Sequence, residues 1–181
     1  GKMVQAFGCA RFLYNQLLGW WQGEYQTARS EGRQMSSLPL VTHFKKGFVF
    51  LNDVDSLVLM NARRHFETAI KNFFQSRKSK GRSIGFPKFK KKGVGKDAFT
   101  TSCVNGNIRI TDGKVKLPKL GWVRCKVHRD IHPEGKIVSA TVSRNKDGRY
   151  HISILVDIPE ERKVRTVSDS IKVVGLDMSF S

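Results

Sequence analysis

The sequence predicts an α+β fold in which a helical part is followed by a small antiparallel β-barrel. Apolar residues recur every three or four positions through the first third of the chain, which is typical of helices that bury one face. From about residue 98 the period changes to two, and short apolar stretches alternate with turn residues, which is typical of antiparallel strands. We therefore expect helices within residues 1–97 and strands within residues 98–160.

Two long helices are expected in the first part. The first has an apolar stripe from Met3 to Trp21, and the second should begin at Asp53 as its N-cap, with Asp55 in its first turn. One face of the second helix is apolar from Leu59 to Phe73. A separate face is either a nucleic-acid surface or an ordinary solvated helix face, and periodicity alone leaves both open. Its members are Ser56, Met60, Arg63, Arg64, Glu67 and Lys71.

The charge of the chain indicates a polyanionic partner. Lysine and arginine number 33 against 15 aspartates and glutamates, which gives a net charge of +18 and a pI near 10.2. Such an imbalance in a compact domain is typical of nucleic-acid binding. A membrane is disfavoured, because the sequence has neither a long uncharged apolar segment nor a secretory signal. The three cysteines are odd in number and form no Cys-x-x-Cys pair, so we expect neither a disulfide framework nor a zinc site, and an intracellular setting.

The most basic stretch, residues 77–96, contains nine lysines and arginines and no acid. It is either an ordered loop or a disordered linker, and the interleaved Phe86 and Phe89 favour an ordered loop whose aromatic rings anchor it to the body. Its lysines would then contact phosphates as point charges. The candidates for contact with a nucleic-acid backbone are Arg77, Lys78, Arg82, Lys88, Lys90, Lys91, Lys92 and Lys96.

Five short strands are expected after this loop. Residues 107–110 and 114–116 flank one hairpin turn, residues 122–128 follow, and residues 137–144 and 149–158 flank a second turn. Strands of this number and length make a small barrel or sandwich. Residues 161–170 read as a linker, and residues 171–176 form a strand apolar enough to be buried on both faces.

Asp177 is the one residue to which we assign catalysis, as a metal ligand. It follows the buried strand, and a carboxylate at a strand tip is how a metal-dependent nuclease of the RNase H-like type begins its catalytic domain. Two-metal hydrolysis needs several carboxylates, and Mg²⁺ suits oxygen ligands, so Asp177 cannot build the site alone. Sugar-kinase and actin-like ATPases begin similarly, and such an aspartate is often only a turn residue. These alternatives stay open.

The order of five motifs resembles the TnpB family, the RNA-guided DNA nucleases of insertion sequences, which are related to compact type V CRISPR effectors. The motifs span nearly the whole chain, and the combination of Gly-Phe-Pro-x-Phe-Lys with Leu-Pro-Lys-Leu-Gly is quite specific. They are Phe-Gly-Cys-Ala-Arg-Phe-Leu-Tyr-Asn at 7–15, His-Phe-Glu-Thr-Ala-Ile-Lys-Asn-Phe-Phe at 65–74, Gly-Phe-Pro-Lys-Phe-Lys-Lys-Lys at 85–92, Val-Lys-Leu-Pro-Lys-Leu-Gly at 115–121 and Val-Gly-Leu-Asp-Met-Ser at 174–179.

The resemblance implies a helical recognition lobe up to residue 97, a wedge-like or OB-like barrel up to residue 160, and the start of a RuvC-type nuclease domain at residues 171–181. A guide RNA encoded by the element would bind the barrel, and duplex DNA with a short motif would lie between helices and barrel. Cleavage by the parent protein would need Mg²⁺, the location would be the bacterial or archaeal cytoplasm, and a homodimer is possible as in compact relatives. The candidates for contact with the DNA motif are Ser56, Met60, Asn61, Arg63, Arg64, Thr101 and Ser102.

Two features depart from the family pattern. The usual N-terminal strand is absent, and so are the later RuvC acids and the zinc-ribbon cysteines. We therefore expect the chain to be part of a longer RNA-guided DNA endonuclease. The alternatives are a nuclease-dead, RNA-guided repressor and a generic basic RNA-binding domain.

Overall fold

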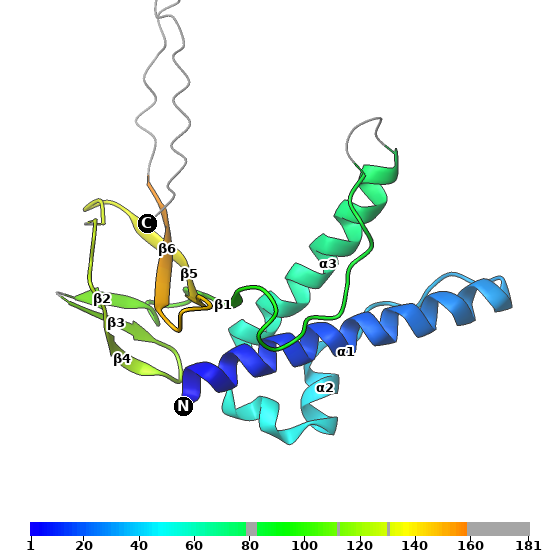
Figure 1. The fold of residues 1–181 in the computed structure, drawn as a ribbon, viewed down its shortest axis with the longest axis horizontal. Helices are drawn as coiled ribbons and strands as arrows, with labels where there is room; N and C mark the ends of the chain where they lie inside the picture. Colours follow the sequence, from blue (N-terminus) through cyan, green and yellow to red (C-terminus); the bar gives the residue numbers. More distant parts are fainter. Residues whose placement is uncertain (79–82, 112, 130, 159–181) are drawn as a thin grey trace, which may run out of the picture.

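The computed structural model describes residues 1–78, 83–111, 113–129 and 131–158, and it confirms the α+β fold class (Figure 1). The linker at 161–170, the strand at 171–176, Asp177 and Arg82 lie outside the described residues. The helical elements are α1 (Lys2–Glu31), α2 (Val41–Gly47), the 3₁₀-helix η1 (Val49–Asp53) and α3 (Ser56–Lys78). The strands are β1 (Asp97–Ser102), β2 (Arg109–Thr111), β3 (Lys114–Leu117), β4 (Gly121–Arg124), β5 (Lys136–Arg144) and β6 (Tyr150–Asp157).

The two long helices are present, but the start of the second was predicted wrongly. α3 begins at Ser56, and the main-chain N–H of Leu57 donates to Oδ1 of Asp55 at 3.2 Å. Asp55 is therefore the N-cap, in the position where a short acidic side chain satisfies a free N–H of the first turn. Asp53 ends η1 instead. Neither η1 nor α2 was predicted, because neither element is long enough to show a helical period.

The strands form two antiparallel three-stranded sheets, one in the order β1-β5-β6 and one in the order β2-β3-β4. Both predicted hairpins are confirmed, with Thr111 paired to Lys114 and Arg144 paired to Tyr150. Gly148 closes the second turn at φ 83°, a conformation that favours glycine. β1 was not predicted as a strand. The predicted barrel is not confirmed, because the described strands pair within two separate sheets.

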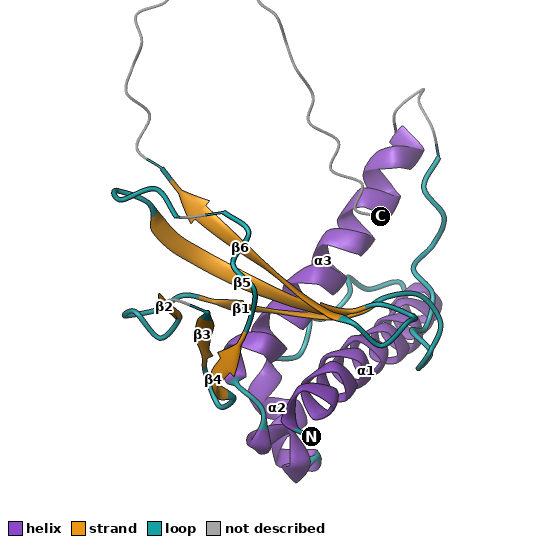
Figure 2. Cartoon of the chain, turned by 60° about the vertical axis from the view of Figure 1, so that its left-hand side comes forward, coloured by secondary structure: helices purple, strands orange, loops and turns teal. Residues whose placement is uncertain are grey.

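Helices and sheets share one hydrophobic core. Leu13 and Leu17 of α1 and Leu59 of α3 are fully buried, and the same cluster includes apolar residues of β1, β3 and β5. Burying a leucine side chain stabilises the fold by about 2 kcal/mol. Figure 2 shows the β1-β5-β6 sheet running up to α3 and α1. The core thus continues across residue 97, and the domain boundary there stays a prediction.

Candidate nucleic-acid interface

The loop formed by residues 83–96, here called the basic loop, returns from α3 across α1 to β1 (Figure 1). Beside it lies a cleft of about 650 Å³ bounded by α1, α3, the loop and β1, here called the basic cleft. Of the described residues that line this cleft, five are lysine or arginine, one is histidine and one is acidic. They are Arg11, Lys88, Lys90, Lys91, Lys96, His65 and Asp97.

The basic loop is ordered, as predicted, and its middle is fixed by Asn15 of α1. The Asn15 side chain donates from Nδ2 to the carbonyl of Lys90 at 2.9 Å, and its Oδ1 accepts from the main-chain N–H of Lys90 at 2.8 Å. Phe86 anchors the start of the loop, because its ring lies 5.6 Å from that of Trp21 and 5.2 Å from that of Phe73. The anchoring role predicted for Phe86 is therefore confirmed.

The Lys90 side chain passes over α1, and Nζ lies 4.0 Å from the centre of the Tyr14 ring. This geometry is a cation–π contact. Burial lowers the pKa of the Lys90 ammonium and raises the pKa of the Tyr14 hydroxyl. Burial also lowers the pKa of His65, with smaller contributions from the charges of Lys90 and Arg64. Lys90 and His65 are nevertheless exposed at the surface, so an anion can reach both side chains.

The acidic residue of the cleft is already neutralised. Asp97 Oδ1 accepts from Nη1 of Arg11 at 3.0 Å, and Oδ2 accepts from Nη2 of Arg144 at 2.7 Å. The hydrogen bond to Asp97 is the main reason why the pKa of Arg144 is raised. This bridge joins α1, β1 and β5. Because Asp97 is engaged by two arginines, it does not offset the charge of the loop lysines.

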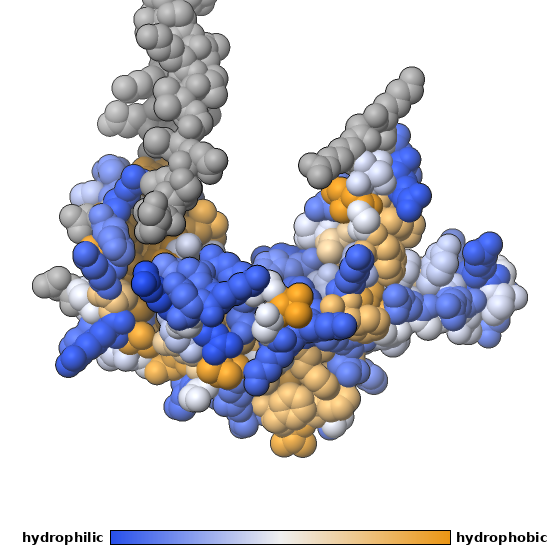
Figure 3. Space-filling view, in the orientation of Figure 1, coloured by the Kyte–Doolittle hydropathy of each residue, from blue (hydrophilic) through white to orange (hydrophobic). Residues whose placement is uncertain are grey.

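The lysines of the basic loop have no ion-pair partner among the described residues. Four of the predicted backbone-contact residues, Lys88, Lys90, Lys91 and Lys96, line the basic cleft. Lys92 is exposed on the same loop, and Arg77 and Lys78 are exposed at the end of α3. Figure 3 shows hydrophilic residues gathered near the middle of this face, above an apolar area at its lower edge. The arrangement can hold an extended polyanion.

Some of the residues predicted to contact a DNA motif are exposed, and others already make hydrogen bonds within the protein. Met60, which is 52% exposed, and Arg64 lie on the surface of α3. Ser56 is exposed as well, although its hydroxyl accepts a hydrogen bond from Lys45 Nζ at 2.8 Å. Arg63 donates to the carbonyls of Leu38 and Pro39 and forms an ion pair with Glu67 at 3.1 Å. Arg63 therefore holds the segment before α2 against α3.

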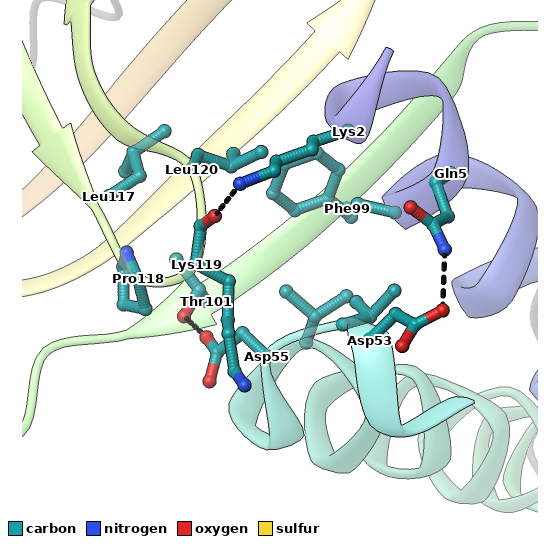
Figure 4. Close-up of a pocket in the computed structure, with 13 residues that line it drawn as sticks. Lys2, Gln5, Asp53, Asp55, Phe99, Thr101, Leu117, Pro118, Lys119 and Leu120 are labelled. Carbon is teal, nitrogen blue, oxygen red and sulfur yellow. Dashed lines mark hydrogen bonds between the residues drawn. The ribbon is translucent and has the colours of Figure 1, made fainter. Parts of the chain in front are cut away.

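Asn61, Thr101 and Ser102 lie where α3 meets β1, here called the α3–β1 joint. Figure 4 shows Thr101 hydrogen-bonded to Asp55 at this joint. Thr101, 1% exposed, donates to Oδ2 of Asp55, and Asn61, 7% exposed, donates to Ser102 Oγ at 3.0 Å. The cavity beside Thr101 is about 20 Å³, which is enough for one water molecule. These side chains stabilise the packing of α3 on β1, and their contact with DNA stays a prediction.

Three residues of the interface were not predicted: Arg11 and His65, which line the basic cleft, and Asn15, which fixes the basic loop. Arg11 and Asn15 lie four residues apart on α1, so they share one side of the helix. Their spacing of four residues on α1 was the available signal. No local pattern singled out His65. It belongs to the site because it lines the same cleft as Lys90, which lies 25 positions later in the sequence.

The described residues do not form a metal site. No group of three histidine, cysteine, aspartate or glutamate side chains in this part of the chain could hold a metal ion. They therefore do not supply the carboxylate set that Mg²⁺ requires. Nor does the described part contain a helix that is both long and apolar enough to cross a membrane.

Comparison with known proteins identifies the family. A family model described as a helix-turn-helix domain, named for OrfB of IS605, matches residues 1–30, which form one continuous helix here. A protein of Streptomyces pristinaespiralis, provisionally named RNA-guided DNA endonuclease, is 31% identical over 190 residues, which cover 99% of this chain and 42% of that protein. InsQ of Escherichia coli (strain K12), named in the same way, is 30% identical over 179 residues, 97% of this chain and 41% of InsQ.

The chain spans about two fifths of the length of these curated relatives. The matches extend over nearly all of its residues, so they cover the helices, the basic loop and both sheets. The chain belongs to the TnpB family of transposon-associated proteins named as RNA-guided DNA endonucleases.

Proposed function

We propose that this chain is the nucleic-acid-binding part of an RNA-guided DNA endonuclease. The observation that carries the proposal is the basic cleft, where four loop lysines and Arg11 surround a single aspartate that is already paired. Lysines without internal partners release counterions when they bind phosphates, so binding should weaken steeply with salt. Family membership indicates which polyanions are relevant, since both relatives are named for RNA guidance and DNA cleavage.

In this proposal the chain recognises the shape and charge of the nucleic acid, while base pairing between the guide RNA and the target strand provides sequence specificity. The basic loop would bind a sugar–phosphate backbone. The exposed face of α3, with Ser56, Met60 and Arg64, would approach a short duplex motif beside the target. The strands would form part of a wedge-like barrel in the longer parent and would bind the guide RNA.

Catalysis is proposed for the parent protein alone. Asp177 would be one ligand of a Mg²⁺ site in a RuvC-type domain, and the described residues contribute no ligand set to it. We expect Asp177→Asn in the parent to abolish DNA cleavage and to leave RNA and DNA binding unchanged. A parent that binds but never cuts would instead be a nuclease-dead repressor.

The test is to express the protein with its native flanking DNA, purify it, and sequence the small RNA that survives a high-salt wash. One discrete RNA from the end of the element would support guide binding and would provide the guide for a cleavage assay. Heterogeneous RNA that is lost at high salt would contradict the proposal and would favour a general RNA-binding domain.

A further inference from the structure

A second cavity, of about 840 Å³, lies between α1 and α2 on the other side of Phe89 from the basic cleft. We call it the aromatic pocket, because aromatic rings from three separate segments surround it. One side is a face of α1, a second side is α2 with the residue after it, and the basic loop closes the third. The lining residues are Asn15, Gln16, Gly19, Trp20, His43, Phe44, Lys46, Gly47, Phe48 and Phe89.

The aromatic pocket contains side chains that the protein itself leaves without partners. Phe89 is 50% exposed, and neither Phe89 nor Trp20 stacks on another ring among the described residues. Phe89 therefore does not anchor the loop as the sequence predicted. The amide of Gln16 has no hydrogen-bond partner in the part of the chain that the structure describes. Two free aromatic surfaces and one free amide thus line one cavity.

Gly19 keeps this cavity open. It lies within α1, three residues after Gln16, and a Cβ at this position would meet no atom within 4 Å. Glycine is unfavourable in the interior of a helix compared with alanine, and neither a tight turn nor close packing requires it here. A larger residue at position 19 would occupy the pocket and would fit the folded chain equally well.

The pocket and the basic cleft are joined by Phe89, which lines both. The neighbours of Phe89 in the sequence, Lys88 and Lys90, line the cleft. A strand whose phosphates lie on these lysines would therefore carry its bases past the Phe89 ring. Unpaired bases bind proteins by stacking on aromatic rings and by hydrogen bonds along their edges, and glutamine amides suit such edges.

We propose that the aromatic pocket binds an unpaired nucleobase of a single strand whose phosphates lie on the basic loop. Trp20 and Phe89 contact the faces of the base, and the Gln16 amide hydrogen-bonds its edge. The inference rests on the proposed function for the presence of a single strand, and it adds a base-binding subsite that the phosphate contacts alone do not require.

The probe is a short single-stranded oligonucleotide with 2-aminopurine at one central position, and a second oligonucleotide that is abasic there. Binding to the 181-residue chain is measured by 2-aminopurine fluorescence and by anisotropy, with RNA and DNA versions of the same sequence. The variant is Gly19→Leu, which fills the pocket. The matched control is Gly23→Leu, since Gly23 is exposed on the same helix, lies outside the pocket, and also has free space around a built Cβ.

Removing the base should weaken binding to the unmodified chain roughly 5- to 150-fold, the range that stacking on aromatic side chains supplies. Gly19→Leu should reduce binding of the intact strand to that of the abasic strand and should bind the abasic strand normally. Gly23→Leu should behave as the unmodified chain. If the chain binds one of the RNA and DNA versions more tightly, that result identifies whether the base comes from RNA or from DNA.

Equal affinity for intact and abasic strands, or a base effect that survives in Gly19→Leu, would overturn the proposal. Either result leaves the proposed function standing if the strands still bind in a salt-dependent way. Loss of binding by every oligonucleotide, in contrast, would count against the proposed function as well.

Discussion

The basic cleft and the α3–β1 joint are both polar, but they use polar side chains in opposite ways. At the joint, the carboxylate of Asp55 and the amide of Asn61 each make two hydrogen bonds within the protein. In the cleft, the loop lysines have no ion-pair partner among the described residues, and Asp97 is engaged by arginines instead. The difference indicates that the joint contributes stability and that the cleft keeps its charge available for a ligand.

The sharpest test of this contrast is the substitution Asp55→Ala. It removes the N-cap of α3 and leaves the buried hydroxyl of Thr101 without its acceptor. We expect the free energy of unfolding to fall by about 2–4 kcal/mol, from the lost cap and the unsatisfied buried group. Urea unfolding measures this change, while the nucleic-acid affinity of the folded fraction should be unchanged.

Asp55→Asn is the control for this substitution, because asparagine is also a good N-cap and its amide oxygen can accept from Thr101. It should lose less than half as much stability as Asp55→Ala. Equal losses in the two variants would mean that the charge of Asp55, rather than its hydrogen bonds, holds the joint.

The next largest effect is expected for the triple substitution of Lys88, Lys91 and Lys96 by glutamine. Affinity for a short DNA duplex should fall by one to two orders of magnitude at low salt, and the slope of log K against log salt should shrink by about 2–3. Stability should change little, because these side chains are exposed and make no ion pairs among the described residues. Fluorescence anisotropy across a salt series gives both the affinity and the slope.

The control removes the same charge from Lys114, Lys136 and Lys146, which are exposed on the sheets and the second hairpin. It should affect binding of the duplex much less than the loop variant does. If both triple variants lose the same affinity, net charge alone drives binding and the cleft has no special role.

Local patterns predicted much of this molecule, and long-range contacts explain what they missed. The two hairpins followed from their turn residues, and the lysines of the loop were visible as a charge run. The hydrogen bonds between Asn15 and Lys90 join residues 75 positions apart, so no local pattern could reveal them. The barrel was not confirmed for a related reason: a period of two shows which side chains share a face but not which strands pair.

Long-range contacts were also missed at the candidate site. The resemblance to the TnpB family, which places duplex DNA between helices and barrel, made Thr101 and Asn61 candidates for contact with DNA. In the structure their polar atoms are bonded to Asp55 and Ser102, across the joint. Periodicity identifies polar positions, but only the packing of α3 on β1 shows whether a polar side chain is already satisfied.

The smallest of the expected effects concerns His65, whose pKa is lowered by burial and then by the charges of Lys90 and Arg64. Arg11 and Asp97 line the same cleft. In the free protein, the lowered pKa favours neutral His65, so its contribution to stability is present above the usual histidine pKa and is lost as pH falls through that range. A phosphate in the cleft would favour the protonated form and raise the pKa of His65. Binding should therefore be linked to proton uptake.

We expect the affinity for a short DNA duplex to rise as pH falls from about 7.5 to about 5.5, by up to about tenfold for each unit by which binding raises the pKa. His65→Gln should remove this pH dependence and keep the salt dependence, because the lysines remain charged throughout. His128→Gln is the matched control, since His128 is exposed and does not line the cleft. Anisotropy titrations at fixed salt measure the slope. A slope that persists in His65→Gln would show that the protons are taken up by another group and would contradict the role assigned to His65.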